Sequence, residues 1–457
     1  MPIASINPAT GRLVRVFEEY SETLVEAALA RAASAAVAWR HTTVATRAGM
    51  LARVGDKLDA DRERLAALAT LEMGKTLQSA RDELTKCALA CRHYAMHAAA
   101  MLEPERAEID GATATLRLQP LGVVLAVMPW NFPFWQVIRA AAPALAAGNV
   151  ILLKHASNVP QCALALEELF LPAHTPERIV QTLLIGSSRV GSLVADRRVA
   201  AVTLTGSDAA GRDVASRAGR AIKRTVLELG GSDPFIVLRS ADVPAAAAAA
   251  VKARMINNGQ SCIAAKRFVV DEAVGDEFEQ RFVDGVRALR VGDPMDPATD
   301  VGPLATEQIR RELTSQLERS VARGARVLIG GHPLDGPGWF FAPTVCGDVP
   351  LDAAIATEEV FGPVAPIFRV PDTAAAIALA NATPFGLGAS VWTRDAEEAA
   401  RCVEEVDAGM VFVNAMVASD PRFPFGGVKE SGYGREVGDA GLREFVNLKT
   451  VRGSAAG

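Results

Sequence analysis

Aromatic residues and net charge are both scarce in this 457-residue sequence. Aromatic side chains make up 5% of it, with only three tyrosines, and the formal net charge is −5. Proteins that bind nucleic acids use aromatic side chains to stack on bases and a basic surface to contact phosphates. The composition therefore argues against a nucleic-acid-binding protein.

Long apolar runs and cysteines are also few. No apolar run is long enough to span a bilayer, and "VPAAAAAAVKARM" is short and soon charged, so we expect a packed helix there. The opening "MPIASINPATG" is polar and lacks a secretory pattern. Six cysteines in a chain of this length predict reduced thiols in the cytoplasm. We expect no membrane partner and no nucleic-acid partner.

The sequence does contain a long alternation of short apolar runs and helix-like segments. Residues 21 to 102 show three-and-four spacing, which predicts helices. From about residue 122 to 240, runs such as "GVVLAVMP" and "NVILLKH" are separated by helix-like sequence, and a second set begins at "KRFVVDE". This pattern predicts two α/β lobes in series, each with a parallel sheet. "TATLRLQP" predicts a projecting strand pair, and "FVNLKTV" a final strand.

The segment "NNGQSC", residues 257–262, places a cysteine in an unusually polar stretch. Buried, inert cysteines usually lie among apolar residues. Gly259, Gln260 and Ser261 precede Cys262, so backbone NH groups are free to face whatever the sulfur attacks. A cysteine nucleophile needs access and a depressed pKa, which a nearby helix N-terminus would supply. The alternative is a silent buried cysteine.

The segment "CALACRHYAMH" contains two cysteines and two histidines and resembles a metal cluster. On a helix each residue turns by about 100°. Cys87 and Cys91 then share one face, while His93 and His97 lie on the opposite face. A tetrahedral site cannot form within such a helix, so we predict no metal site.

The segment "VMPWNFPFWQVIRAAAPALAAGN" holds Asn131 between Pro129 and Pro133. A rigid amide donor at a strand end is suited to stabilising an oxyanion. A turn or capping asparagine is an equally good interpretation of the spacing. Trp135 and Arg139 follow at steps of four, which predicts a stripe from a donor past an aromatic wall to a cation. A solvated helix charge is the alternative for Arg139.

The segment "TVLELGGSDPFIVL" places Glu228 between two leucines. An apolar environment disfavours the charged carboxylate and raises its pKa, which suits a general base. An exposed glutamate at a strand end is the alternative. "GSSRVG" and "GSDAAG" each lie near a strand end and open toward a helix, but neither matches G-x-G-x-x-G.

Together these segments resemble the aldehyde dehydrogenase superfamily. "PWNFP", "TGS", "LELGG", "GQSC", "EEVFGP" and "PFGGVKESGYGRE" occur in the expected order over nearly the whole chain. The resemblance implies an α/β fold with two Rossmann-like domains and a small bridging β element. The cofactor domain is expected at 1–111 and 122–229, the catalytic domain at 230–418, and the bridging element at 112–121 and 419–457. Bridging strands add to a neighbour's sheet, so a homodimer or homotetramer is expected.

The resemblance also implies roles for residues at the matching positions. Cys262 is the expected nucleophile, Asn131 and the Cys262 backbone NH form the expected oxyanion hole, and Glu228 is the expected base that activates water. The expected mechanism passes through a thiohemiacetal and a thioester and needs no metal. The residues expected to contact the cofactor are Trp130, Lys154, Ser157, Gly206, Ser207, Glu359 and Phe361.

The cofactor preference is predicted from the run "KHASNVP". Members of the superfamily that prefer NAD typically carry a glutamate three residues after the lysine. Ser157 occupies that position here. A carboxylate repels a 2′-phosphate, whereas a serine hydroxyl can bond to one. We therefore predict NADP as the preferred cofactor, with NAD also usable.

Arg139 matches the arginine with which semialdehyde dehydrogenases of this superfamily bind the substrate carboxylate. Ser419 matches a loop serine that assists, and Trp135 and Ser261 complete the expected substrate site. The resemblance thus implies oxidation of succinate semialdehyde to succinate. Many such enzymes have a second arginine where this chain has Ile256, so glutarate semialdehyde or a broader range of aldehydes stays open.

Three other functions are weighed against this prediction. A cysteine hydrolase needs a histidine partner, and none of the six histidines lies in a comparable strand-end loop. Enzymes of the branch that acylates coenzyme A generally lack the glutamate base, which is present here. A catalytically inactive binding or structural homologue would tend to lose Cys262 or Glu228, and the sequence retains both.

Overall fold

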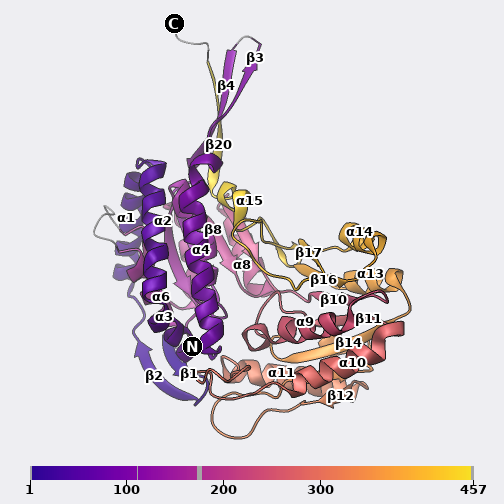
Figure 1. Ribbon diagram of the computed structural model, residues 1–457. Coiled ribbons are helices and arrows are strands. Elements are labelled where there is room, and N and C mark those ends of the chain that lie inside the picture. Colours follow the sequence, from indigo (N-terminus) through magenta and orange to yellow (C-terminus); the bar gives the residue numbers. More distant parts are fainter. Residues whose placement is uncertain (1–2, 111, 172–177, 454–457) are drawn as a thin grey trace.

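The computed structural model describes residues 3–110, 112–171 and 178–453. Figure 1 shows two α/β lobes side by side and a narrow β arm that projects away from both. The predicted domain segments also include residues 1–2, 111, 172–177 and 454–457, which lie outside the described residues. None of the described helices is both long and apolar enough to cross a membrane.

The first lobe begins with a hairpin and four helices. Polar side chains start the helices, since the hydroxyls of Ser21, Thr43 and Thr76 each accept a bond from a backbone NH three residues on. The elements are β1 (Ile3–Asn7), β2 (Arg12–Phe17), α1 (Glu22–Trp39), α2 (Val44–Ala60), α3 (Arg62–Met73) and α4 (Leu77–Met101).

The sheet of this lobe has the strand order β19-β9-β8-β5-β6-β7, and only β19 runs antiparallel to its neighbour. The strands are β5 (Val123–Met128), β6 (Val150–His155), β7 (Val180–Thr182), β8 (Val199–Thr205), β9 (Arg224–Glu228) and β19 (Gly432–Tyr433). The crossover segments contain α5 (Trp135–Ala147), α6 (Pro160–Leu169), η1 (Ser187–Arg189), α7 (Val190–Ala195) and α8 (Asp208–Arg220). Every residue of α5 is buried, so its polar side chains must find partners inside the protein.

The second lobe has a seven-stranded sheet of order β12-β13-β14-β11-β10-β16-β17, in which only β12 is antiparallel to its neighbour. Its strands are β10 (Pro234–Val237), β11 (Arg267–Asp271), β12 (Arg326–Ile329), β13 (Thr344–Gly347), β14 (Val364–Val370), β16 (Gly388–Trp392) and β17 (Met410–Val413). Its helices are α9 (Val243–Met255), η2 (Ile256–Gly259), α10 (Glu272–Arg287), α11 (Glu307–Ala322), α12 (Ala354–Thr357), α13 (Thr373–Asn381) and α14 (Ala396–Glu405). The predicted α/β class with two lobes in series is confirmed.

The β arm consists of β3 (Glu105–Ile109), β4 (Ala112–Pro120) and β20 (Val446–Gly453) in the order β20-β4-β3. The predicted partnership of "TATLRLQP" with the final strand is confirmed, since Leu118 pairs with Leu448. Several strand pairings cross the expected domain boundaries. β3, predicted within the cofactor domain, pairs with β4. Of the predicted bridging segment 419–457, described as far as residue 453, β20 joins the arm. In contrast, β18 (Val428–Lys429) pairs with β15 (Phe385–Gly386), β19 pairs with β9, and α15 (Gly438–Arg443) packs near α5.

Candidate functional site

A cavity of about 310 Å³ lies at the carboxyl ends of β8 and β9. There these strands meet the segment between η2 and β11, which contains Cys262. Both lobes contribute to it, which is the usual location of ligands in open α/β sheets. It brings together predicted catalytic and cofactor residues that are far apart in the sequence. Its lining includes Trp130, Asn131, Gln136, Thr205, Gly206, Ser207, Gly230, Cys262, Gln316, Glu359 and Phe361.

Cys262 reaches this cavity because the chain turns sharply after α9. Asn257, Asn258 and Gly259 are three consecutive residues with positive φ, of 55°, 60° and 76°. Asparagine and glycine tolerate this conformation best. A β-carbon at position 259 would overlap the Gly362 backbone, so the turn also requires close contact with the segment around Phe361. The polar composition of "NNGQSC" thus has a conformational cause.

Burial raises the pKa of the Cys262 thiol to about 12, although the nearby positive charges of Arg139 and Lys266 oppose this shift. The depressed pKa expected from the sequence is therefore wrong for this state. Cys262 follows the short helix η2 and does not itself precede a helix, and the helix that begins at the same cavity is α8. In this environment the thiol remains protonated at neutral pH.

The side chain of Asn131 is buried and directed at the nucleophile segment. Its Nδ2 donates to the carbonyl oxygen of Gln260 at 3.2 Å. Asn257 Nδ2 donates to the carbonyl oxygens of both Asn131 and Gln260, at 2.7 and 3.0 Å. These bonds fix the Asn131 amide beside Cys262, as an oxyanion donor requires.

Glu228 ends β9 and is buried, with neither carboxylate oxygen hydrogen-bonded to any described residue. Burial raises its pKa well above the ordinary value, Arg139 opposes the shift, and Glu436 adds to it. An unpartnered buried carboxyl near a thiol is expensive and is typical of an acid–base group. The alternative of an exposed strand-end glutamate is wrong.

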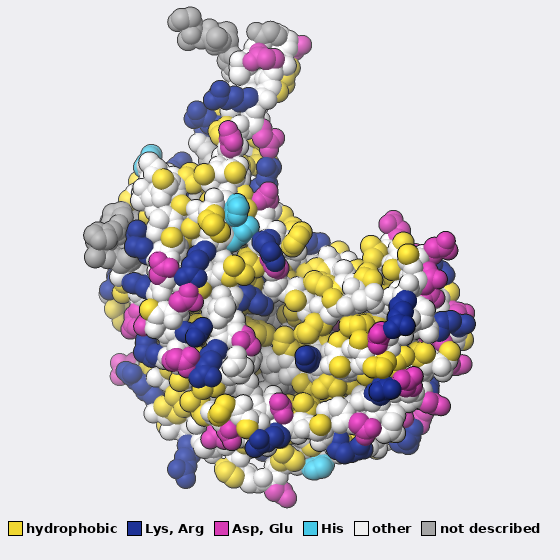
Figure 2. All heavy atoms as spheres, viewed as in Figure 1, with side chains coloured by type: hydrophobic (Ala, Val, Ile, Leu, Met, Phe, Trp, Pro, Cys, Tyr) yellow, Lys and Arg dark blue, Asp and Glu magenta, His cyan; other side chains and the backbone are white. Residues whose placement is uncertain are grey.

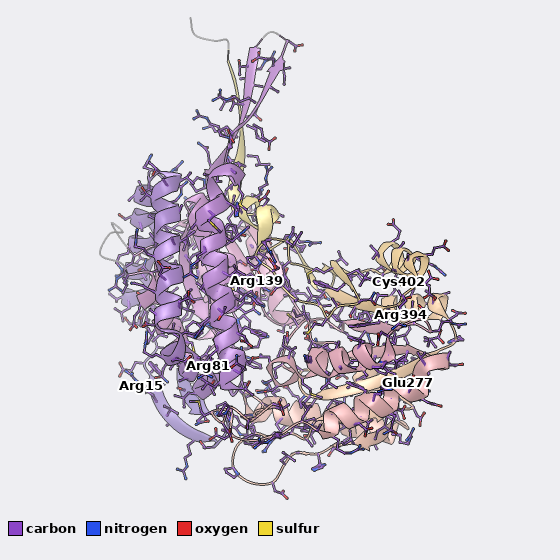
Figure 3. The ribbon with its side chains drawn as sticks, in the orientation of Figure 1. Arg15, Arg81, Arg139, Glu277, Arg394 and Cys402 are labelled. Atoms are coloured by element: carbon purple, nitrogen blue, oxygen red, sulfur yellow. The ribbon has the colours of Figure 1, made fainter. Side chains whose placement is uncertain are left out.

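Arg139 is buried and does not line the cavity that contains Cys262. Figure 3 shows it between α4 and α15. Its Nε forms an ion pair with the buried Glu436, and its guanidinium carbon lies 4.3 Å from the centroid of the Phe425 ring. Its Nη2 donates to Thr205 Oγ1 at 3.4 Å. The carboxylate clamp stays a prediction, and in this structure the guanidinium is paired with Glu436. The alternative of a solvated helix charge is wrong.

The first cavity is also lined by several predicted cofactor residues. Trp130 and Phe361 are in edge-to-face contact, with ring centroids 5.7 Å apart. Glu359 Oε1 accepts a bond from the Gly231 backbone NH at 3.0 Å and lies 3.4 Å from Lys266 Nζ. These contacts hold an aromatic pair and a carboxylate at the rim of the cavity.

Helix α8 begins at this cavity. Ser207 caps the helix by accepting a bond from Ala210 NH at 3.3 Å, and Gly206 precedes it with only ordinary van der Waals contact where a β-carbon would lie. Lys154 and Ser157 lie at the end of β6, outside the lining of the cavity. Burial lowers the pKa of Lys154. A helix N-terminus and a lysine near parallel strand ends form a surface for an anionic ligand.

A second cavity, of about 480 Å³, opens between α4 and α9 on the hollowed face seen in Figure 2. Trp135 belongs to its wall, as expected of a substrate residue. Ser419 is buried beside it and accepts a bond from Lys86 Nζ at 3.2 Å. Ser261 is fully buried and lines neither cavity, and its contact with substrate stays a prediction.

Sequence reasoning missed two buried cations that shape the nucleophile segment. Lys266 Nζ donates to the carbonyl oxygens of Ser261 and Cys262, at 2.9 and 2.7 Å. Arg254 donates to the carbonyl oxygens of Ala265, Gly259, Val360 and Gly362. Each cation was indicated in the sequence. Lys266 lies directly before an apolar strand in "CIAAKRFVV", and Arg254 lies at the end of an alanine-rich helix.

Comparisons with known proteins agree with this geometry. The model of the aldehyde dehydrogenase family matches residues 1–451. The chain is 56% identical over 455 residues to the NADP(+) succinate-semialdehyde dehydrogenase of Mycobacterium avium, covering 99% of this chain and 96% of that protein. It is 55% identical over 454 residues to succinate-semialdehyde dehydrogenase [NADP(+)] 1 of Mycobacterium tuberculosis, covering 99% of each.

A solved structure is similarly close. The succinic semialdehyde dehydrogenase of Streptococcus pyogenes, in complex with NADP+, superposes with a TM-score of 0.96 at 36% identity. The match covers 98% of this chain and 99% of that one. The match therefore extends over nearly the whole chain.

Proposed function

The chain belongs to the aldehyde dehydrogenase family, and on that premise we propose that it oxidises succinate semialdehyde to succinate with NADP as the hydride acceptor. The relatives with more than half of their residues identical act on this substrate with this cofactor, according to their names. The observation that carries the proposal is the position of Cys262 in a cavity that also exposes Asn131, Glu359 and the start of α8.

The residues of the first cavity, together with Lys154 and Ser157 outside its lining, fit a nicotinamide dinucleotide. Lys154 and Ser157 would hold the adenosine ribose and its 2′-phosphate, because neither brings a carboxylate that would repel a phosphate. Gly206 and Ser207 would approach the pyrophosphate at the N-terminus of α8. Glu359 would hold the second ribose, with Phe361 and Trp130 beside the nicotinamide. When bound, NADP supplies the acceptor for a hydride.

The proposed reaction begins at Cys262. The thiol first gives its proton to solvent water, and the thiolate sulfur then adds to the aldehyde carbonyl carbon and forms a thiohemiacetal anion. Asn131 Nδ2 and the Cys262 backbone NH donate to the resulting oxyanion. Loss of hydride from that carbon leaves a thioester on Cys262.

The thioester is then hydrolysed. Glu228 removes a proton from water, the water oxygen adds to the acyl carbon, and the carbon–sulfur bond breaks. The products are a carboxylic acid and the free thiolate of Cys262. The unpartnered, buried carboxyl of Glu228 supports this role, since its raised pKa makes the carboxylate a stronger base.

A four-way kinetic comparison tests the proposed function. Cofactor reduction is followed with succinate semialdehyde and with butyraldehyde, each with NADP and with NAD. We expect the highest kcat/KM for succinate semialdehyde with NADP. Equal kcat/KM values for the two aldehydes would indicate a general aldehyde dehydrogenase, and a clear preference for NAD would contradict the role given to Ser157.

We also propose that the protein assembles from identical subunits, as a dimer or tetramer, and works in the cytoplasm. The projecting arm exposes apolar side chains, with Ile109, Leu448 and Val451 at 47%, 50% and 42% exposure. A three-stranded arm of this kind gains stability when its edge is covered by another copy. All six cysteines are free thiols, as expected in a reducing compartment.

A further inference from the structure

The carboxyl end of β6 lies beside the loop that carries Asn131. β6 pairs with β5 in a register that places His155 opposite Met128, and the loop 129–134 begins directly after Met128. His155 is buried, with 5% of its surface exposed. Its neighbour Lys154, expected to hold the cofactor, faces the other side of the sheet, because side chains alternate along a strand. One strand end therefore carries a cofactor residue and a residue that reaches the Asn131 loop.

The imidazole of His155 forms one hydrogen bond with each nitrogen. Nδ1 accepts a bond from the backbone NH of Ala156 at 2.9 Å. A ring nitrogen that accepts a bond carries no proton, so the proton of the neutral ring is on Nε2. Nε2 then donates to the carbonyl oxygen of Pro133 at 2.8 Å. Burial, more than the neighbouring charge of Lys154, lowers the pKa of His155 to about 4, so this neutral form persists at neutral pH.

The bond from His155 satisfies a carbonyl that the first turn of α5 does not use. The carbonyl oxygens of Phe132 and Phe134 accept bonds from backbone NH groups of α5, at 3.1 and 3.0 Å. In the part of the chain that the structure describes, the Pro133 carbonyl between them bonds to His155 instead. Pro133 is buried, and a buried carbonyl without a donor is costly. Loss of the imidazole NH would therefore favour a shift of this turn.

The NH groups of the same turn are held from the opposite direction. Glu83 Oε1 of α4 accepts bonds from the backbone NH groups of Phe134 and Trp135, both at 2.8 Å. The turn is thus fixed by α4 at its NH groups and by β6 at a carbonyl. Because the proline ring fixes φ at Pro133, the short link from there to Asn131 is stiff. A shift at Pro133 would move the Asn131 side chain.

The position of that side chain matters for the proposed reaction. Asn131 Nδ2 lies 3.2 Å from the carbonyl oxygen of Gln260, two residues before Cys262, and Asn131 Oδ1 accepts a bond from Phe132 NH at 3.1 Å. An oxyanion donor is effective only where it is already directed at the oxygen that becomes charged. Displacements well below 1 Å weaken such a site. The anchors of the loop therefore bear on the rate of the chemical step.

We propose that His155 is a positioning residue for the oxyanion hole, whose Nε2–H holds the Pro133 carbonyl and so fixes the Asn131 amide beside Cys262. The inference rests on the proposed function, which supplies the role of Asn131. His155 itself lies outside the lining of the cavity, so its effect passes through the loop. Since Lys154 is on the same strand end, β6 holds the cofactor and the oxyanion donor in a fixed relation.

The first test compares two replacements of the imidazole. His155→Met removes the donor at similar volume, and His155→Gln keeps an amide NH near the position of Nε2. The single-turnover rate constant for NADPH formation is measured with enzyme in excess over succinate semialdehyde and with saturating NADP. We expect His155→Met to lower this rate constant by about 10- to 100-fold, because the donor is misplaced. His155→Gln should restore most of the rate, and the dissociation constant of NADP should change little in both.

A double-mutant cycle distinguishes positioning of Asn131 from a general loss of stability. Asn131→Ala alone should lower the single-turnover rate constant by about 10²- to 10³-fold, the range for one oxyanion donor. In the Asn131→Ala background, His155→Met should lower it by less than about 2-fold more, because the side chain that His155 positions is gone. A residue with a merely structural role would produce independent effects that multiply.

Thr182→Val is the matched control. Thr182 is buried on β7 of the same sheet, and its Oγ1 donates to the carbonyl oxygen of Ala163 at 2.8 Å. The substitution removes a buried side-chain donor to a backbone carbonyl, as His155→Met does, at a site outside the lining of the cavity. Thr182→Val should lower the denaturation midpoint but leave the single-turnover rate constant unchanged.

The outcomes separate this inference from the proposed function. A wild-type protein that oxidises no aldehyde, or an Asn131→Ala variant as fast as wild type, contradicts the proposed function and the inference with it. A slow Asn131→Ala variant combined with an unchanged rate for His155→Met, or with multiplying effects in the cycle, contradicts only the inference. If His155→Met fails to bind NADP, His155→Asn, whose amide ends short of the Nε2 position, replaces it in the cycle with the same expectations.

Discussion

At the scale of single residues, the environment of Cys262 is more costly for a thiolate than its sequence context indicates. Burial raises the pKa of its thiol. The positive charges that oppose this shift belong to Arg139, which is distant in sequence, and to Lys266, whose Nζ donates to the backbone carbonyl oxygen of Cys262. Such a thiol is unreactive until a proton is removed within the site.

Replacement of the nucleophile is the first prediction at this scale. Cys262→Ala should abolish aldehyde oxidation while NADP still binds, because the thiol forms the covalent intermediate but does not hold the cofactor. Activity assays and a fluorescence titration with NADP measure the two properties. Cys402→Ala, a buried cysteine on α14 (Figure 3) that does not line the first cavity, is the control and should remain active. Turnover by Cys262→Ala would refute covalent catalysis.

Replacement of the base is the second prediction. Glu228→Gln should lower the steady-state rate by about 10²- to 10⁴-fold, the range for loss of a general base. A burst of about one reduced cofactor per site should persist, because the thioester still forms. Stopped-flow absorbance measures both phases. Glu404→Gln, on the exposed side of α14, should behave as wild type.

The same residue predicts a pH dependence. Burial raises the pKa of Glu228, so the carboxyl stays protonated to a higher pH and the basic form appears only as the pH rises through that value. The hydrolysis rate of the wild-type enzyme should therefore increase with pH. Single-turnover decay of the thioester at several pH values measures this, and a flat profile for wild type would contradict the assignment.

At the scale of elements, the turn after α9 is held by Arg254. Its guanidinium is fully buried, burial lowers its pKa to about 9, and it donates to carbonyl oxygens of both the nucleophile segment and the segment around Phe361. One side chain thus connects η2 to the cofactor side of the site. Three residues in the left-handed region make this turn dependent on such contacts.

The third prediction follows from these bonds. Arg254→Met should reduce the free energy of unfolding by on the order of 3 kcal/mol, because buried carbonyl oxygens lose their donors. Lys252→Met, two residues earlier and exposed, should change it by less than about 0.5 kcal/mol. Chemical denaturation measures both variants. Equal effects of the two substitutions would show that the bonds of Arg254 contribute little to stability.

At the scale of the whole molecule, the β arm projects from the lobes and has little contact with either (Figure 1). Its strands join residues 105–120 to the last strand of the chain. Exposed apolar side chains on a small, isolated sheet are costly unless another surface covers them. A second copy of the chain is the proposed cover.

The fourth prediction tests this assembly. Wild-type protein should have a solution mass of two or four chains by light scattering after size exclusion. The double variant Leu448→Glu and Val451→Glu should form a smaller species, because the charges oppose burial of the arm. Leu351→Glu, at an exposed position of the second lobe, should leave the mass unchanged. A monomeric wild-type protein would refute the proposed assembly.

The sequence by itself determined the α/β class, the two lobes and the family. Local apolar runs, helix periodicity and six short motifs carry that information, since backbone conformation and burial depend largely on neighbouring residues. The same motifs predicted that Cys262, Asn131 and Glu359 share one site, and one cavity contains all three. Their catalytic roles stay predictions.

Only the tertiary structure decided how the charges are distributed. Arg139 pairs with Glu436 and Lys86 bonds to Ser419, and these partners are about 300 or more residues apart. A pattern of spacing cannot reveal whether a cation is already neutralised, because the counterion comes from another part of the chain. The pKa of Cys262 was mispredicted for the same reason, since burial by both lobes outweighs the local polarity of "NNGQSC". Ionisation and charge pairing depend on the folded surroundings, which form only when the lobes pack together.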